Sequence, residues 1–252
     1  MDTDSWFDFS ERVVLISGGA GAIGREISLA FARAGAQIVV ADLDAEAAAK
    51  VAAEAGSDAI SAALDVCDAE AAEALAEHLW EQHGHIDVLV NTAAVYIRVA
   101  AVDLTEADFD RTMDINVKGT WLLSQAVGRH MIERGYGRII NYTSNAGNRG
   151  SSLQLAYNAS KAAVISMTKS LAVEWGRTGV TVNAVAPGPT NTALMAPAFS
   201  DPALVESFSQ RIPQGVLTPS DVTVGPVLFL ASPMAGSITG HVLYADGGMS
   251  AT

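Results

Sequence analysis

The chain has 252 residues with 28 acidic and 15 basic side chains, which gives a net charge of −13. That balance argues against nucleic acid or an anionic membrane surface as a partner, and no apolar run reaches the length of a membrane span. Half of the residues are hydrophobic, enough for a sizeable core. The single cysteine, Cys67, excludes an internal disulfide and suits a reducing compartment. Because the N-terminus lacks the features of a signal peptide, we expect a cytoplasmic protein.

The first predicted elements are a strand, a glycine-rich turn and a helix. The apolar run 12–17 ends in the turn 18–24, and apolar residues at helical spacing continue to Gly35. This order is typical of a phosphate-binding loop, because glycines let the backbone approach a pyrophosphate and the helix N-terminus offers free N–H groups. The glycines alone would also fit an ordinary tight turn.

A second strand, residues 37–42, ends in an acid where dinucleotide-binding folds place one. The Asp42 carboxylate can accept hydrogen bonds from both ribose hydroxyls of an adenosine. It would repel a 2′-phosphate, and no Arg or Lys stands nearby in the sequence to receive one. The sequence therefore favours NAD over NADP as the cofactor.

Strands and helices continue to alternate along the next part of the chain. Helices are predicted over 45–55 and 69–82, and strands over 59–66 and 88–91. Near-continuous apolar strands between helices predict an α/β fold, a Rossmann-type doubly wound parallel sheet with helices on both faces. Ligands bind such sheets at the C-terminal strand ends. Those ends carry Gly18–Gly24, Asp42, Asp65, Asn91, Ser144 and Pro187-Gly188.

A long helix is predicted over 105–134, with an acidic start that resembles a capping box. Asn116 lies in its middle, where Asn is disfavoured unless its side chain has a task, and an exposed Asn is an equally good interpretation. Gly119 beside it permits a kink or close packing. The remaining predictions are strands over 138–144, 181–186 and 241–245 and a helix over 155–178. No repeat or Pro-rich linker marks a boundary, so residues 1–252 are expected to form one domain with about seven strands.

Tyr157 and Lys161 are four residues apart in a helical pattern and therefore share one helix face. A phenol titrates near pH ~10, too high for a base at neutral pH. A cation beside it favours the phenolate, and lowering the pKa by about three units takes roughly 4 kcal/mol. Such a pair can move a proton on and off a substrate hydroxyl. Taken alone, the spacing is a common coincidence between surface residues.

The features occur in an order that resembles the short-chain dehydrogenase/reductase family, in its single-domain branch, over essentially the whole chain. The resemblance is carried by the turn Ser17–Gly24, Asn91-Thr92-Ala93-Ala94, Asn116, Ser144 thirteen residues before Tyr157, Lys161, and Pro187–Thr192. The chain departs from the family's pattern at a few positions. Ala22 stands where Gly is common, Ser17 where Thr is common, and Asn-Thr-Ala-Ala replaces Asn-Asn-Ala-Gly. These small changes bear on the local fit of the cofactor.

The resemblance implies a catalytic set of four residues. Tyr157 would be the base in alcohol oxidation, and Lys161 would lower its pKa and hold the nicotinamide ribose. Ser144 would hydrogen-bond the substrate oxygen. Asn116 would distort its helix and hold a water in a proton relay to Lys161. The implied NAD-binding residues are Ser17, Gly18, Ala22, Ile23, Gly24, Asp42, Leu43, Asp65, Val66, Asn91, Ala93, Tyr157, Lys161, Pro187, Gly188, Thr190 and Thr192.

The expected reaction is hydride transfer between a secondary alcohol and NAD, with a polyol or sugar favoured as the substrate. By analogy with the family, Asn145, Asn148, Gln154 and Pro189 would contact it, and residues 190–215 would form a mobile lid. The Asn and Gln side chains would equally well cap turns. A carbonyl or 3-oxoacyl reductase is the alternative enzyme, against which Asp42 counts because such reductases usually use NADPH. An NAD-binding sensor or scaffold is the alternative outside enzymes.

Partners and metal ligands are weakly encoded. The expected partner is a small alcohol or ketone, with no nucleic acid and no membrane. His78, His83 and His85 lack metal-ligand spacing, so no metal site is expected. The helices predicted over 105–134 and 155–178 are apolar on more than one face. Together with the resemblance, this predicts a homotetramer.

Overall fold

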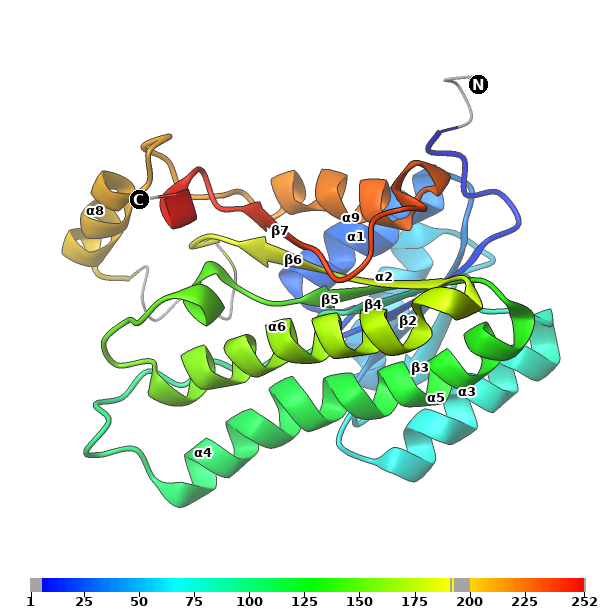
Figure 1. Ribbon diagram of the computed structural model, residues 1–252, viewed down its shortest axis with the longest axis horizontal. Coiled ribbons are helices and arrows are strands. Elements are labelled where there is room, and N and C mark those ends of the chain that lie inside the picture. Colours follow the sequence, from blue (N-terminus) through cyan, green and yellow to red (C-terminus); the bar gives the residue numbers. More distant parts are fainter. Residues whose placement is uncertain (1–5, 191, 193–199, 252) are drawn as a thin grey trace.

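A computed structural model describes residues 6–190, 192 and 200–251, in which all seven strands pair in parallel within one sheet (Figure 1). The strands are β1 Val13–Ser17, β2 Gln37–Asp42, β3 Ile60–Ala63, β4 Val88–Asn91, β5 Gly137–Tyr142, β6 Val180–Pro187 and β7 Val242–Ala245. Their spatial order is β3-β2-β1-β4-β5-β6-β7. The direction of winding reverses between β1 and β4, and at such a switch point this class of sheet binds ligands.

Helices cover both faces of the sheet, as predicted (Figure 1). One face carries α1 Ala22–Arg33, α2 Ala45–Ala55 and α9 Val224–Ala231, and the other α3 Ala69–His83, α4 Glu106–Met113, α5 Thr120–Arg134 and α6 Leu155–Trp175. Helix α8, Pro202–Arg211, stands beyond the C-terminal strand ends. Short 3-10 turns are η3 Asn145–Asn148, η4 Gly176–Thr178, η6 Asp221–Thr223, η7 Pro233–Ala235 and η8 Met249–Ala251. The predicted doubly wound α/β fold is confirmed.

The core has two layers because side chains alternate along each strand. In β1, Val14 and Ile16 pack toward α1 and α9, whereas Val13 and Leu15 pack toward α3 and α5. All five residues of β1 are buried. Burial on both faces explains why the central strands read as unbroken apolar runs.

The helix predicted over 105–134 is interrupted. Thr105 caps α4 by accepting a hydrogen bond from the Asp108 N–H at 3.1 Å. A π-helical turn, η2 Asp114–Gly119, then separates α4 from α5. Gly119 packs so closely on the neighbouring loop that a Cβ there would lie 2.6 Å from Val66 Cγ2. The two helices are therefore joined at a distortion centred on Asn116.

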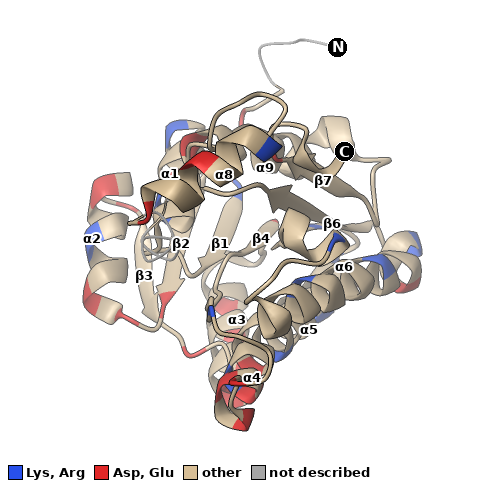
Figure 2. Ribbon diagram, turned by 90° about the vertical axis from the view of Figure 1, so that its left-hand side faces the viewer, with Lys and Arg blue, Asp and Glu red and all other residues tan. Residues whose placement is uncertain are grey.

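Figure 2 views the molecule from the end at which the strands have their C-termini, with Asp and Glu residues along α2 and α4.

Helices α8 and α9 are additional to the predicted elements. Helix α8 lies within the segment expected to form a lid, and no element is predicted over α9. β3 is shorter than the predicted 59–66, since the chain turns at Asp65, whose carboxylate accepts from the Cys67 N–H at 2.9 Å. Among the described helices none combines the length and apolarity that a membrane span requires.

Candidate active site

Two adjoining cavities open at the C-terminal strand ends. The first, about 350 Å³, is lined by the glycine turn and the ends of β2, β3 and β4, and we call it the glycine-turn cavity. The second, about 150 Å³, is lined by Ser144, Tyr157 and residues of β6 and α8, and we call it the tyrosine cavity. Ile23 and Thr192 line both. A ligand in one cavity would therefore lie against a ligand in the other.

The glycine turn has the geometry of a phosphate-binding loop. Gly18 has a φ of +64°, and a Cβ there would lie 2.6 Å from the Ala93 backbone nitrogen. A Cβ on Gly24 would lie 2.3 Å from the Gly18 carbonyl oxygen, so both positions require glycine. Helix α1 begins at Ala22 with no side-chain cap on its first turn. Its N–H groups and positive dipole end suit the pyrophosphate of a dinucleotide.

Asp42 ends β2 at the rim of the glycine-turn cavity. Its two carboxylate oxygens accept hydrogen bonds from the Ala20 N–H at 3.0 Å and the Asp44 N–H at 3.1 Å, which fix its orientation. Among the described residues that line this cavity, Arg111 of α4 is the one cation. The predicted residues Leu43, Asp65, Val66 and Ala93 also line it. These groups fit the adenosine half of a nicotinamide cofactor.

Ser17 and Asn91, which are predicted to bind the cofactor, have their side chains inside the fold. Both are buried and line neither cavity. The Ser17 hydroxyl donates to Asn91 Oδ1 at 3.3 Å, and Asn91 Nδ2 donates to Ser124 Oγ at 3.0 Å and Asn141 Oδ1 at 2.9 Å. Polar strand-end residues can be satisfied inside the fold, and these two join β1, β4, β5 and α5 beneath the glycine-turn cavity.

Tyr157 and Lys161 occupy the first turns of α6, one helical turn apart as predicted. Tyr157 lines the tyrosine cavity, and Lys161 lies deeper, 3% exposed and outside the lining of both cavities. The Lys161 Nζ donates to the Tyr142 carbonyl oxygen at 2.9 Å and lies 5.6 Å from the centre of the Tyr157 ring. The ammonium is therefore held behind the phenol by the end of β5.

The pKa of Tyr157 moves in the opposite direction to the prediction. Burial raises the pKa of Tyr157 to about 12, although its hydrogen bond with Ser144 opposes the rise. Burial also lowers the pKa of Lys161 to about 8. Both shifts favour the neutral forms, because a charged group loses hydration on burial. In this structure desolvation is the largest cause of the shift at Tyr157 and the one cause of the shift at Lys161.

Two neighbours fix the phenol at the cavity wall. Ser144 follows β5, hydrogen-bonds the Tyr157 hydroxyl and accepts from the Ala146 N–H at 3.1 Å. The Tyr96 ring packs edge-on against the Tyr157 ring, with 5.0 Å between centroids and an interplanar angle of 89°. Tyr96 follows β4 and carried no signal in the sequence. Ser144 and Tyr157 together place two hydroxyls on the wall of the tyrosine cavity.

Asn116 is fully buried, which excludes the interpretation as an exposed residue. Its Oδ1 accepts from the Val95 N–H at 2.8 Å, and its Nδ2 donates to the Val95 carbonyl at 3.0 Å and Ser160 Oγ at 3.0 Å. Asn116 thus ties the loop after β4 to α6 beside Lys161. It lines neither cavity, so it acts on the site through Val95 and Ser160.

The residues predicted to contact the substrate do not all lie at the tyrosine cavity. Asn145, Gln154 and Pro189 line it, whereas Asn148 is exposed and does not. Thr190 lies in the segment after β6, where its hydroxyl donates to the Gly188 carbonyl at 2.9 Å. Pro187, Gly188, Thr190 and Thr192 line the tyrosine cavity. Of the predicted lid, residues 191 and 193–199 lie outside the described residues.

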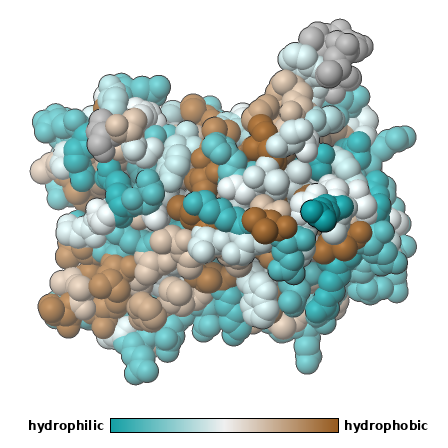
Figure 3. Space-filling view, in the orientation of Figure 1, coloured by the Kyte–Doolittle hydropathy of each residue, from teal (hydrophilic) through white to brown (hydrophobic). Residues whose placement is uncertain are grey.

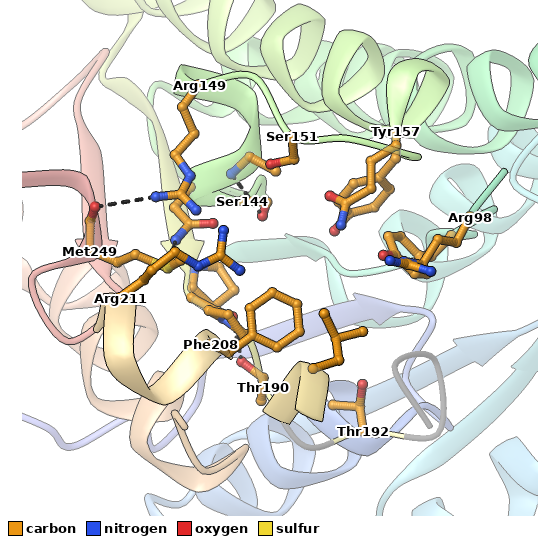
Figure 4. A pocket seen from close by; sticks show the side chains of 18 of the residues that line it. Arg98, Ser144, Arg149, Ser151, Tyr157, Thr190, Thr192, Phe208, Arg211 and Met249 are labelled. Carbon is orange, nitrogen blue, oxygen red and sulfur yellow. Dashed lines mark hydrogen bonds between the residues drawn. The ribbon is translucent and has the colours of Figure 1, made fainter. Parts of the chain in front are cut away.

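Sequence reasoning missed several residues of the tyrosine cavity (Figure 4). Arg149 lies next to Asn148 and between Asn145 and Gln154, which are predicted substrate contacts, so its position is a usable signal. Arg98, Arg211 and Met249 come from three distant segments that only the fold brings together. Within the part of the chain that the structure describes, no cluster of His, Cys, Asp and Glu is suited to a metal ion.

Comparisons with known proteins agree with this geometry. The family model for enoyl-(acyl carrier protein) reductase matches residues 18–250. D-threitol dehydrogenase of Mycolicibacterium smegmatis is 38% identical over 98% of this chain and 96% of its own length. A (2S)-[(R)-hydroxy(phenyl)methyl]succinyl-CoA dehydrogenase subunit of Thauera aromatica is 39% identical over 95% and 96%.

A solved structure of gluconate 5-dehydrogenase from Burkholderia cenocepacia, in complex with NADP and tartrate, superposes with a TM-score of 0.95. It is 33% identical and covers 98% of each chain. The similarity in sequence and fold extends along nearly the full length of the chain. The chain therefore belongs to the short-chain dehydrogenase/reductase family.

Proposed function

We propose that this protein oxidises a secondary alcohol of a small polyhydroxylated substrate with NAD. The observation that carries the proposal is the pair of hydroxyls of Ser144 and Tyr157 on the wall of the tyrosine cavity, which adjoins the glycine-turn cavity. A nicotinamide cofactor bound in the glycine-turn cavity would supply the hydride acceptor. One domain would then hold both cofactor and substrate.

The chain's own residues handle the proton. Tyr157 removes the proton of the substrate hydroxyl, and Ser144 donates a hydrogen bond to the oxygen as it becomes a carbonyl. The phenolate lies in a buried site, so it needs a cation, and Lys161 is the buried cation one turn along α6. Asn116 is a positioning residue that holds the loop after β4 against α6 through Val95 and Ser160.

The choice of NAD rests on Asp42. Its carboxylate is oriented by two backbone N–H groups at the cavity rim, where a 2′-phosphate would meet a negative charge. The Burkholderia relative was solved with NADP, which makes NADP the competing assignment. A wild-type preference for NAD⁺ over NADP⁺ in kcat/KM is the expected result.

A polyol or sugar is the substrate class that we favour. Asn145 and Gln154 line the tyrosine cavity and offer amide groups to hydroxyls. The names of the threitol and gluconate dehydrogenases support the same class. The alternative is a carbonyl or 3-oxoacyl reductase, in keeping with the acyl-carrier reductase description of the family model. That reading needs an NADPH-linked activity on acyl thioesters.

We also propose a homotetramer. Trp121 on α5 and Val173 on α6 are large apolar residues that are 43% and 86% exposed. Figure 3 shows hydrophobic side chains gathered near the first turns of α4 and α6. Leu155, the first residue of α6, and Val102, which precedes α4, are large apolar residues that are exposed. Apolar helix faces of this kind suit a second subunit as their cover.

The test is a screen of polyols, sugars, sugar acids and 3-hydroxyacyl thioesters, with NADH and NADPH formation followed by absorbance. We expect turnover of a polyhydroxylated alcohol with NAD⁺. Turnover confined to acyl thioesters with NADP⁺ would favour the reductase. Cofactor binding without turnover across all four classes would favour a sensor or scaffold and contradict the enzyme assignment.

A further inference from the structure

The charged side chains that line the tyrosine cavity are positive, whereas the net charge of the chain is negative. Arg98, Arg149 and Arg211 line it, from the loop after β4, the segment after η3 and the end of α8. No Asp or Glu lines it among the described residues, although the chain as a whole has a net charge of −13. A cationic cavity in an acidic protein concentrates anions and not neutral molecules.

Arg149 lies close enough to Arg211 to feel its positive charge. Burial lowers the pKa of Arg149 and the charge of Arg211 lowers it further, while the carboxylate of Asp246 acts in the opposite direction. Asp246 does not line the cavity and is beyond ion-pair distance within the part of the chain described. Figure 4 shows Arg149 and Arg211 at one end of the cavity and Arg98 at the other.

Much of the hydrogen-bonding capacity of these two guanidinium groups is left over. Arg149 donates to the Met249 carbonyl at a long 3.5 Å, and its buried Nε has no partner in the described structure. Arg211 donates from Nε to the Ser207 carbonyl at 3.0 Å, and its guanidinium packs on the Phe208 ring at 5.1 Å. Neither forms an ion pair with any described carboxylate, unlike Arg12, Arg25, Arg129 and Arg134.

We propose that the substrate is an acid, and that its carboxylate binds to Arg149 and Arg211 while its secondary hydroxyl binds to Ser144 and Tyr157. The inference rests on the proposed function and names the substrate class within it as a polyhydroxylated carboxylic acid. A carboxylate would relieve the repulsion between the two cations and give Arg149 the acceptor that it lacks. The carboxylate is unchanged by the reaction and fixes which hydroxyl reaches Tyr157.

The experiment uses matched pairs that differ only in one terminal group, D-gluconate with D-glucitol and galactonate with galactitol. With NAD⁺, we expect kcat/KM for the acid to exceed that for the polyol by about tenfold or more. Arg149→Gln and Arg211→Gln should each lower the ratio of kcat/KM for the acid to that for the polyol by about tenfold. Arg149→Lys should lower it by less, because Lys keeps the positive charge but cannot form the paired hydrogen bonds of a guanidinium with a carboxylate.

Arg129→Gln is the matched control, since Arg129 lies on α5 in an exposed pair with Glu73 and should leave the ratio unchanged. Equal turnover of acids and polyols, or a ratio that neither Gln variant alters, would overturn the inference and leave the proposed function standing. A preference for D-glucitol 6-phosphate over both would replace the carboxylate by a phosphate and overturn it as well.

Calorimetric titration with D-gluconate separates the two claims. Binding that Arg149→Gln weakens about tenfold, without turnover of any alcohol, would support the acid site and contradict the proposed function. Turnover of polyols without measurable D-gluconate binding would support the proposed function and contradict the acid site.

Discussion

At the scale of single residues, burial and proton transfer place opposite demands on the charges of Tyr157 and Lys161. Burial raises the pKa of the phenol and lowers that of the ammonium, so the fold favours the two neutral groups. In the proposed mechanism, proton removal from an alcohol needs the phenolate, which a charged Lys161 would stabilise. Burying the pair would therefore lower the free energy of unfolding in exchange for a reactive phenol, a trade-off that is common at active sites.

Lys161→Met tests both sides of this balance. The folded-state pKa of about 8 lies below the 10.5 of the unfolded chain, so the unfolded state binds the extra proton. The penalty is fully present below pH 8 and is lost as the pH rises from 8 to 10.5. At pH ~7 we expect Lys161→Met to gain about 2 kcal/mol in unfolding free energy, after allowing for its lost hydrogen bond.

The same variant should lose activity. Without the cation, the kcat/KM for alcohol oxidation should fall by about a hundredfold, and its rise with pH should move to higher pH. Urea unfolding and pH–rate profiles measure the two effects. Lys169→Met is the control, since Lys169 is exposed on the same helix and should change neither. A destabilised Lys161→Met with an unshifted pH profile would contradict the balance described here.

At the scale of elements, the distortion η2 between α4 and α5 positions the cofactor side of the site. Gly119 ends η2 and meets Val66, which lines the glycine-turn cavity. A Cβ at Gly119 would lie 2.6 Å from Val66 Cγ2 and 3.2 Å from its carbonyl oxygen, so the loop after β3 must move if it is present.

Gly119→Ala should therefore raise the KM for NAD⁺ several-fold and lower the Tm, since such overpacking costs about 1–3 kcal/mol. Adding Val66→Ala should recover part of both losses, because it removes the methyl group at 2.6 Å but leaves the Val66 Cβ, at 2.9 Å, in place. Gly176→Ala is the control, because nothing lies within 4 Å of a Cβ there. An unchanged KM for NAD⁺ in Gly119→Ala would show that the loop is not set by this contact.

Local patterns predicted the elements that have a local cause. The glycine turn, the apolar strands and the acid at the end of β2 each follow from neighbouring residues, so they were visible in the sequence. The π-turn was expected only as a kink, because its cause lies in contacts of Asn116 with Val95 and Ser160 from other elements. The arginines of the tyrosine cavity were missed for the same reason, since Arg149 and Arg211 meet across two elements.

Strand-end residues show the limit most clearly. Asn91 and Asp42 both end parallel strands, yet only Asp42 lines the glycine-turn cavity. The side chain of Asn91 instead donates hydrogen bonds to Ser124 and Asn141 inside the fold. Position at a strand end places a residue near the site but does not decide which way its side chain turns. That decision depends on polar partners in α5 and β5, which are remote in sequence.

At the scale of the whole molecule, the apolar faces of α5 and α6 predict assembly. Light scattering at micromolar concentration should give a tetramer for the wild type. Trp121→Glu combined with Val173→Glu should reduce it to a smaller species, because two charges would be desolvated in the interface. Val222→Glu is the control, an exposed valine on another face. A wild-type monomer would contradict the proposal.

The central claim is that Tyr157 removes the proton of an alcohol beside the cofactor, and Tyr157→Phe tests it most directly. The variant keeps the ring that packs on Tyr96 and loses only the hydroxyl. With NAD⁺ binding held intact by calorimetry, NADH formation from the best alcohol substrate should fall by about a hundredfold or more. NADH formation at the wild-type rate, with the same NAD⁺ affinity, would contradict the claim.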